Sequence, residues 1–546
     1  MKYFLLILLL CLPAFVQMLR FGLYTTHDFH FFRQYEFDKC ISDHVFPCRW
    51  SANAGMGYGE PVFNFYGQLP YVFGQIFKYL GFSVIDSVKT VFILSLVLSS
   101  VFMYLLSRRF WGHLGGLISA LFYVFAPYRA IDVWVRGALP ESLAFVFFPL
   151  ILLSLEKYLH RPRLLPLLEF SLSWAGLVLV HNLSAFMFFP FVIIWWLWRS
   201  RQSRGIMSGI PLLAAFIFSL FLSAFYLLPV IFESRLTTVN DTTRIYYEYG
   251  LHFTSLKQLF VSRFWGYGGS VWGLNDTMSF SAGHLHWILA VIIGLYLLMK
   301  RQIKSPLTNN YLLFTGLGIF ALFLTHGKSD FIWRLVPYIR FVQFPWRFLT
   351  ITALFLALAS GSIARILPNK FIPYILLLLL LTNFMFFRPD IWRPISDSVQ
   401  FSGVLWDEQR ASSLQDYWPK SAPLKPREFA PSLPEFTTGQ GQVAVFHKSS
   451  HSAQAQITVS SPRAEVLFPI VYFPGWTAQI SGRRFRVIPS GDLGRITVLL
   501  PAGSYLVQLR FTDTPVRRIG NLVSLVSGIL LLSALLIIKK PSYAKS

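Results

Sequence analysis

Ionisable side chains gather in a few short stretches of a chain in which only 13% of the residues are charged. The first stretch, "THDFHFFR", follows an apolar N-terminal run and contains His27, Asp28, His30 and Arg33. A carboxylate in such a cluster can accept a proton from a substrate hydroxyl. We therefore expect acid–base chemistry here, with Asp28 as the base and His27 and His30 beside it.

Cationic side chains recur in three later stretches, "APYRAIDVWVRGALPE", "LVHN" and "VQFPWR". Guanidinium groups suit bidentate contacts with phosphate. A carboxylate, several cations and apolar surroundings together suit the transfer of a sugar from a polyprenyl phosphate to a hydroxyl. The expected substrate- and phosphate-binding residues are Arg33, Arg129, Arg136, Glu141, His181 and Arg347.

Each of these residues also has a structural interpretation. Asp28 is a favoured helix N-cap, and Glu141 after Pro140 suits the first turn of a helix. Arg129 and Arg136 are spaced to form ion pairs with Asp132 on an outer loop. His181 and Asn182 suit hydrogen bonds between helices. The sequence leaves both interpretations open.

The elements that must position these residues are membrane helices. The chain has 546 residues, of which 54% are hydrophobic and 17% aromatic, and its mean hydropathy is positive. About twelve apolar runs approach the roughly 20 residues of helix that cross a bilayer. These predicted segments are 3–19, 90–107, 114–130, 141–159, 164–180, 185–198, 208–232, 286–299, 311–325, 348–367, 371–387 and 520–538.

The net charge of +23 follows this helical pattern. Basic residues concentrate in short connectors such as 108–109, 160–163, 199–204 and 300–304, which all face the cytoplasm if the N-terminus does. The charge therefore indicates membrane topology, and we expect no nucleic-acid partner. The long connections, 20–89 above all, then lie outside the cell membrane with the working face.

The composition changes between residues 388 and 518, where proline, serine and charged residues increase. Runs such as "AQAQITVSS" and "GRITVLL" alternate with period two and are separated by turn signals such as "FPGW" and "LPAGS". We expect a multi-pass domain over 1–387, a small extracytoplasmic β-sandwich over 388–518, and a last helix with a cytoplasmic tail over 519–546.

Cys40 and Cys48 lie in the first outer loop. In an oxidising compartment they are expected to form a disulfide worth about 2 to 3 kcal/mol. His44 between them leaves a zinc site as the alternative. The cofactor requirement stays open, a divalent metal included.

Several longer stretches resemble a family of integral membrane proteins. They are "THDFHFFRQYEFDK", "PCRWSANAGMGYGEPVFNFYGQLPYVF", "APYRAIDVWVRGALPESLAFVFFPLILLSLE", "LVLVHNLSAFMFFPFVI", "VQFPWRF" and "YFPGWTAQISG" to "LPAGSYLVQLRF". The family is labelled 6-pyruvoyl-tetrahydropterin synthase-related and is similar to YfhO-like proteins and, in architecture, to GT-C glycosyltransferases. The resemblance implies lipid-phosphate sugars as donors and Asp28 as the base. Pterin chemistry is not expected, because the chain has no soluble domain with a three-histidine zinc site.

Two functions fit these observations. The first is an inverting membrane glycosyltransferase that uses a polyprenyl-phosphate sugar and an extracytoplasmic glycan, lipid or protein acceptor. The second is a non-enzymatic membrane protein that moves or presents lipid-linked glycans. Transporters place charge near the bilayer midplane, whereas here it lies at the outer ends of the helices, which favours the enzyme.

Overall fold

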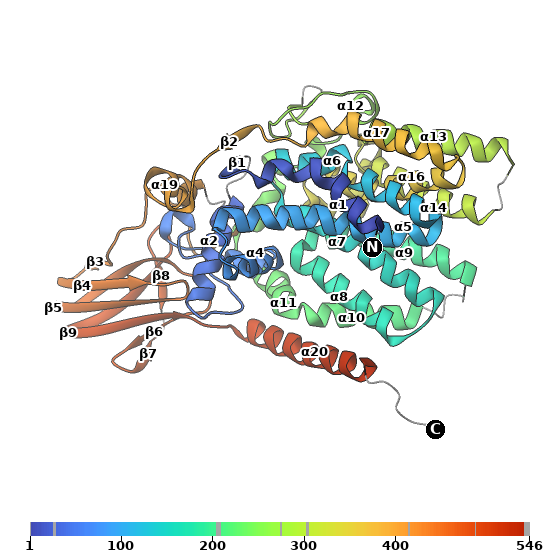
Figure 1. Ribbon diagram of the computed structural model, residues 1–546. Helices are drawn as coiled ribbons and strands as arrows, with labels where there is room; N and C mark the ends of the chain where they lie inside the picture. Colours follow the sequence, from blue (N-terminus) through green and yellow to red (C-terminus); the bar gives the residue numbers. More distant parts are fainter. Residues whose placement is uncertain are drawn as a thin grey trace.

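The computed structural model describes residues 2–25, 29–203, 209–273, 276–301, 305–412, 415–485 and 487–539. A bundle of helices occupies most of the molecule, and a β-sheet extends from one end of it (Figure 1). The helices of the bundle are α1 (Lys2–Phe15), α5 (Val84–Val124), α7 (Leu139–His160), α8 (Leu164–Val180), α9 (Asn182–Ser203), α10 (Gly209–Leu222), α11 (Ala224–Glu233), α13 (His284–Met299), α14 (Pro306–Phe323), α16 (Leu349–Ser360), α17 (Ile372–Asn383) and α20 (Pro515–Lys539). Two shorter helices, α2 (Phe29–Ser42) and α4 (Leu69–Tyr79), lie near the end that carries the sheet (Figure 1).

Over its described residues, each of the twelve predicted apolar segments is largely helical, and the segment 208–232 is divided between α10 and α11. Within the described residues, eight helices are long and apolar enough to cross a membrane. The pair α10 and α11 is a ninth candidate, bent by 77°, while α8 and α13 are apolar but shorter. The prediction of a polytopic α-helical membrane protein is thus confirmed.

One of the eight, α5, contains the predicted segment 90–107 and most of 114–130, because the chain reverses inside it. Gly112 has a φ of 74°, a value that favours glycine. Ser107 Oγ lies 2.7 Å from Ser119 Oγ, and Tyr104 Oη lies 2.6 Å from His113 Nδ1. Twelve residues of straight helix would span about 18 Å, so the two halves must run antiparallel.

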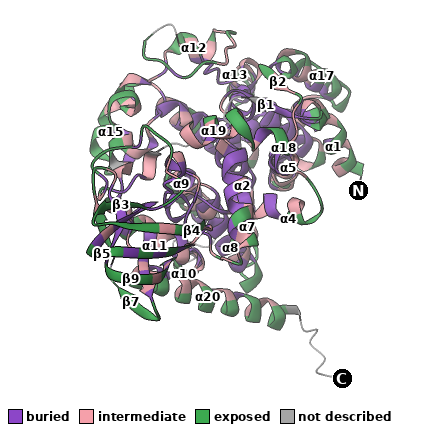
Figure 2. Ribbon diagram, turned by 90° about the vertical axis from the view of Figure 1, so that its left-hand side faces the viewer, coloured by how far each residue is buried: buried purple, intermediate pink, exposed green. Residues whose placement is uncertain are grey.

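The burial of the helices separates those that form the core from those at the surface. In Figure 2, α2 is largely buried, whereas α20 is exposed along much of its length. Exposed apolar side chains cover that surface of α20, namely Leu522, Leu525, Ile529, Leu532 and Leu536. Such a continuous apolar surface suits contact with lipid.

The predicted β-rich domain precedes α20. Its strands are β3 (Glu435–Thr438), β4 (Gly441–Lys448), β5 (Ser452–Val471), β6 (Trp476–Ile480), β7 (Arg483–Phe485), β8 (Ile488–Ser490) and β9 (Arg495–Phe511). All pairings are antiparallel, in the order β3-β5-β9-β6-β7, with β4 on β5 and β8 on β9. The long strands β5 and β9 pair with each other along most of their length. The shorter strands flank this pair, with β3 and β4 on β5 and with β6 and β8 on β9.

The first loop shares a hydrophobic core with this sheet. The Trp50 ring lies 5.4 Å from that of Trp476 and 5.0 Å from that of Phe511. Lys448 Nζ donates to the carbonyl of Ala52 at 3.1 Å. Because aromatic burial contributes strongly to cores, the first loop and the sheet form one packed unit.

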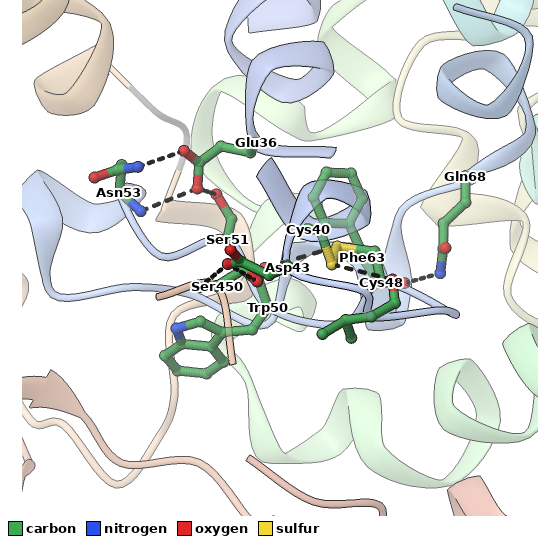
Figure 3. Close-up of a disulfide and its surroundings, with 11 residues drawn as sticks. Glu36, Cys40, Asp43, Cys48, Trp50, Ser51, Asn53, Phe63, Gln68 and Ser450 are labelled. Carbon is green, nitrogen blue, oxygen red and sulfur yellow. Dashed lines mark hydrogen bonds between the residues drawn. A yellow bond between two sulfur atoms is a disulfide. The ribbon is translucent and has the colours of Figure 1, made fainter. Parts of the chain in front are cut away.

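A disulfide joins Cys40 at the end of α2 to Cys48 in this loop (Figure 3), with 5.9 Å between the Cα atoms. Nearby, the Asp43 carboxylate accepts hydrogen bonds from the backbone N–H and the hydroxyl of Ser450 at 2.8 and 2.6 Å. The disulfide uses both thiols, so it leaves no thiolate for a zinc site with His44.

We expect the double variant Cys40→Ser, Cys48→Ser to lose about 2 to 3 kcal/mol of stability, because its unfolded chain gains loop entropy. Thermal unfolding of the full chain in detergent measures the loss. Reductant should destabilise the wild type to the same extent and leave the variant unaffected. A wild type that is equally stable with and without reductant contradicts the prediction.

Candidate functional site

A cavity of about 690 Å³ lies where the helices meet the first loop and the segment leading into the β-sheet. Its wall takes residues from α2, α9, α11, the beginning of α7, the turn at 341–347 and the stretch 416–417. This volume lies within the usual range of small-molecule sites. The cavity therefore has room for a ligand the size of a sugar phosphate.

Six of the predicted site residues line this cavity, although they come from distant parts of the chain. They are His30, Arg33, Arg136, Glu141, His181 and Arg347. The wall contains three arginines and two carboxylates, those of Glu141 and Asp416. With its histidines neutral, it carries an excess of positive charge.

The centre of the charged wall is a network around Arg136 and Glu141. Arg136 follows a short π-helix, η3 (Ile131–Val135), and Glu141 lies in the first turn of α7. Arg136 Nη1 lies 2.7 Å from Glu141 Oε2 and 2.9 Å from Asp132 Oδ1. Tyr128 Oη and Thr350 Oγ1 donate to Glu141 Oε1 at 2.7 and 3.2 Å. These contacts hold the carboxylate ionised and fix the guanidinium at the cavity wall.

Arg347 brings a second guanidinium to the same place. Its Nε lies 3.8 Å from Glu141 Oε2, and its Nη1 donates to the carbonyl of Val342 at 2.8 Å. The Arg136 guanidinium lies 4.8 Å from the centre of the Trp346 ring. Two cations are thus held side by side against an aromatic surface, a suitable arrangement for phosphate.

His181 lies between α8 and α9 and contributes a neutral side chain. Its Nδ1 is 2.7 Å from Ser184 Oγ. Burial lowers the pKa of His181 to about 4; the charge of Glu141 opposes this shift, and those of Arg347 and Arg136 reinforce it. The imidazole is therefore uncharged near neutral pH and able to exchange hydrogen bonds.

Gly67 allows the first loop to reach His181. A Cβ at Gly67 would lie only 2.4 Å from the carbonyl oxygen of Val180, at the end of α8. The neighbouring Tyr66 also lines the cavity. The absence of a side chain at Gly67 thus brings α8 and the loop together at the cavity wall.

His30 and Arg33 connect α2 to the cavity. His30 Nδ1 lies 3.0 Å from Tyr71 Oη, and the backbone N–H of Leu139 donates to its Nε2 at 3.3 Å. The Arg33 guanidinium lies 3.9 Å from the centre of the Tyr66 ring. His30 therefore has a clear positioning role between α2 and the beginning of α7.

The predicted residues His27 and Asp28 lie outside the described residues. Strand β1 (Leu23–Thr25) pairs with β2 (Ile391–Arg393), and α2 begins at Phe29, which itself lines the cavity.

Arg129 does not line the cavity. It is fully buried, and its Nη1 and Nη2 donate to the Ser142 carbonyl at 2.6 Å and to Ser95 Oγ at 3.0 Å. Its guanidinium lies 4.1 Å from the centre of the Phe145 ring. These contacts hold α5, α6 (Pro127–Ala130) and α7 together, a structural role that the sequence had left open.

Other cavity residues were missed by the sequence analysis. They include one carboxylate, Asp416, and four tyrosines, Tyr66, Tyr246, Tyr247 and Tyr417. Asp416 lies in the string "QDYW", which falls within the stretch 388–518 that the sequence predicts to be β-rich. A carboxylate next to two aromatic residues, Tyr417 and Trp418, was the signal available. Among the described residues, no group of three His, Cys, Asp or Glu side chains is arranged to hold a metal ion.

The fold and the cavity define a polytopic α-helical membrane protein with an arginine-rich cavity beside a β-sheet domain. No family model matches the chain. An uncharacterized protein of Lactococcus lactis subsp. cremoris (strain MG1363) is 24% identical over 241 residues, which is 42% of this chain and 39% of that protein. The cryo-EM structure of the arabinofuranosyltransferase AftD from mycobacteria is similar over 70% of this chain, with 15% identity and a TM-score of 0.41. The match covers 26% of the AftD chain, so this chain is similar to only part of either protein.

Proposed function

We propose that this protein is a membrane glycosyltransferase that transfers a sugar from a polyprenyl-phosphate donor to an acceptor on the extracytoplasmic face. The observation that carries this proposal is the cavity, in which Arg136 and Arg347 present two guanidinium groups at the ends of apolar helices. A phosphate leaving group requires such cations, because negative charge builds on it as the sugar departs.

The neighbouring helix α11 supports a lipid as donor. Val230 lines the cavity, whereas the adjacent Ile231 and Phe232 are exposed on the outside of the bundle. The bend between α10 and α11 lies about two helical turns before Val230. A polyprenyl tail can therefore remain in the bilayer along α11 while its phosphate reaches the arginines.

The transfer step that we propose is a single displacement with inversion. The acceptor oxygen forms a bond to the anomeric carbon as the bond from that carbon to the phosphate oxygen breaks. The acceptor proton passes to a carboxylate, for which we propose Asp28, and the electron pair of the broken bond leaves with the polyprenyl phosphate. Arg136 and Arg347 stabilise the charge on that phosphate.

Replacing Arg347 with glutamine is expected to weaken binding of a polyprenyl phosphate by about tenfold or more, since a charged hydrogen bond is lost. The full chain, purified in detergent, should be stabilised against heat by a long-chain polyprenyl phosphate and not by the polyprenol of equal length. The Arg347→Gln variant should lose most of this stabilisation.

Arg244, exposed on a nearby loop, offers the matched control Arg244→Gln, which should respond to the lipid like the wild type. Equal stabilisation by the polyprenol and the phosphate would contradict the proposal. Binding of the phosphate without turnover, with any sugar donor and acceptor, would instead favour a protein that moves or presents lipid-linked glycans.

A further inference from the structure

Asp416 and Tyr417 form a part of the cavity wall that we call its second end, because the ion pairs of Arg136 and Glu141 join other residues. These two residues belong to η15 (Gln415–Tyr417), between α19 (Gly403–Ser412) and the β-sheet. Burial and the charge of Asp416 raise the pKa of Tyr247, and the charge of Arg347 lowers it. Tyr247, Asp416 and Arg347 all line this one cavity.

The segment that carries Asp416 is firmly anchored. The backbone N–H of Tyr417 donates to Glu60 Oε1 at 2.8 Å, and that of Thr238 donates to the Trp418 carbonyl at 2.9 Å. Trp418 is only 1% exposed and belongs to the core shared by the sheet and the first loop. Asp416 is therefore presented by a fixed backbone, as a binding site requires.

The side chain of Asp416 retains its capacity to accept hydrogen bonds. Among the residues that the structure describes, none forms a hydrogen bond or an ion pair with the Asp416 carboxylate. Burial raises the pKa of Asp416, and the charges of Arg33 and Lys425 oppose that shift. A partly buried carboxylate in this state gains from hydroxyl donors, which replace the water it has lost.

Flat aromatic rings surround this end of the cavity. The Tyr417 ring stacks on that of Phe65, with centroids 5.4 Å apart and planes inclined by 26°. Tyr66 lines the cavity with Arg33 over its ring. Sugars match such a wall, because they have apolar C–H faces that pack on rings and hydroxyl rims that bind carboxylates and guanidinium groups.

We propose that this end is a carbohydrate-binding subsite in which Asp416 accepts hydrogen bonds from glycan hydroxyls while Tyr66 and Tyr417 contact the sugar ring. The subsite makes the acceptor a neutral glycan rather than a protein or a simple lipid. That assignment of the ligand as acceptor rests on the proposed glycosyltransferase function, whereas the binding itself does not.

The test uses the full chain in detergent on a printed array of neutral oligosaccharides built from hexoses, pentoses or N-acetylhexosamines. The best ligand on the array is then titrated as a soluble trisaccharide. We expect at least one sugar class to bind, and Asp416→Asn to weaken its affinity by about tenfold or more. Asp492→Asn, on an exposed turn of the β-domain, is the matched control and should bind like the wild type.

Unchanged thermal stability of Asp416→Asn shows that the loss concerns the ligand. An array without any bound neutral glycan, equal affinity of Asp416→Asn and wild type, or an equal loss in Asp492→Asn would each overturn the subsite. Failure of the proposed transferase is a separate result, because it would appear as absent polyprenyl-phosphate binding even if glycans bind at Asp416.

Discussion

Replacing Arg136 with glutamine is expected to destabilise the protein by about 3 to 5 kcal/mol, the usual cost of removing one partner of a buried ion pair. Asp132 is 0% and Glu141 3% exposed, so water cannot replace the guanidinium that both carboxylates contact. Thermal unfolding of the full chain in detergent should show the loss even without any ligand.

The partner variant tests this explanation. In Arg136→Gln the buried Asp132 loses its ion-pair partner, whereas Glu141 keeps its contact with Arg347. Adding Asp132→Asn removes the carboxylate that has lost its partner, so the double variant should recover part of the stability. Arg510→Gln, at an exposed position on β9, is the matched control and should unfold like the wild type. If Arg136→Gln unfolds at the wild-type temperature, the network does not hold the cavity wall together.

Replacing Asp28 with asparagine is expected to lower the rate of sugar transfer by roughly a hundredfold or more, because asparagine keeps the shape but cannot take the acceptor proton. Folding and binding of the polyprenyl phosphate should persist. The assay is turnover of a polyprenyl-phosphate sugar in reconstituted membranes, with the glycan that binds at the Asp416 subsite as acceptor.

Asp390→Asn provides the control for this variant, since Asp390 is exposed and lies just before β2, the strand that pairs with β1. Near-normal turnover by Asp28→Asn would remove this residue from the mechanism.

Arg129 shows that residue type alone does not tell a buried arginine from one that lines the cavity. Arg129 and Arg136 look equivalent in "YRAIDVWVR", and both were predicted to bind phosphate. The structure buries Arg129 among Ser95, Ser142 and Phe145, whereas Arg136 reaches the cavity. The difference depends on how α5 and α7 pack, which no local pattern encodes.

The membrane helices, the β-rich stretch before α20 and most of the charged residues of the cavity could be predicted from the sequence. Hydropathy over some twenty residues and period-two alternation are local properties. They can therefore be recognised in the sequence without knowing which segments pack together in the fold. The scarcity of charge in an apolar chain also made "VRGALPE" and "FPWR" conspicuous.

Which of these residues meet at the cavity follows from the packing of the whole chain. Arg33, Arg136, His181 and Arg347 are separated by scores of residues, and their convergence depends on the reversal at Gly112 and on the order in which the helices pack. Asp416 joins them because the first loop and the β-sheet share a core that carries η15 to the cavity. Such contacts arise from long-range packing, in which the free energy of one residue depends on neighbours distant in the chain.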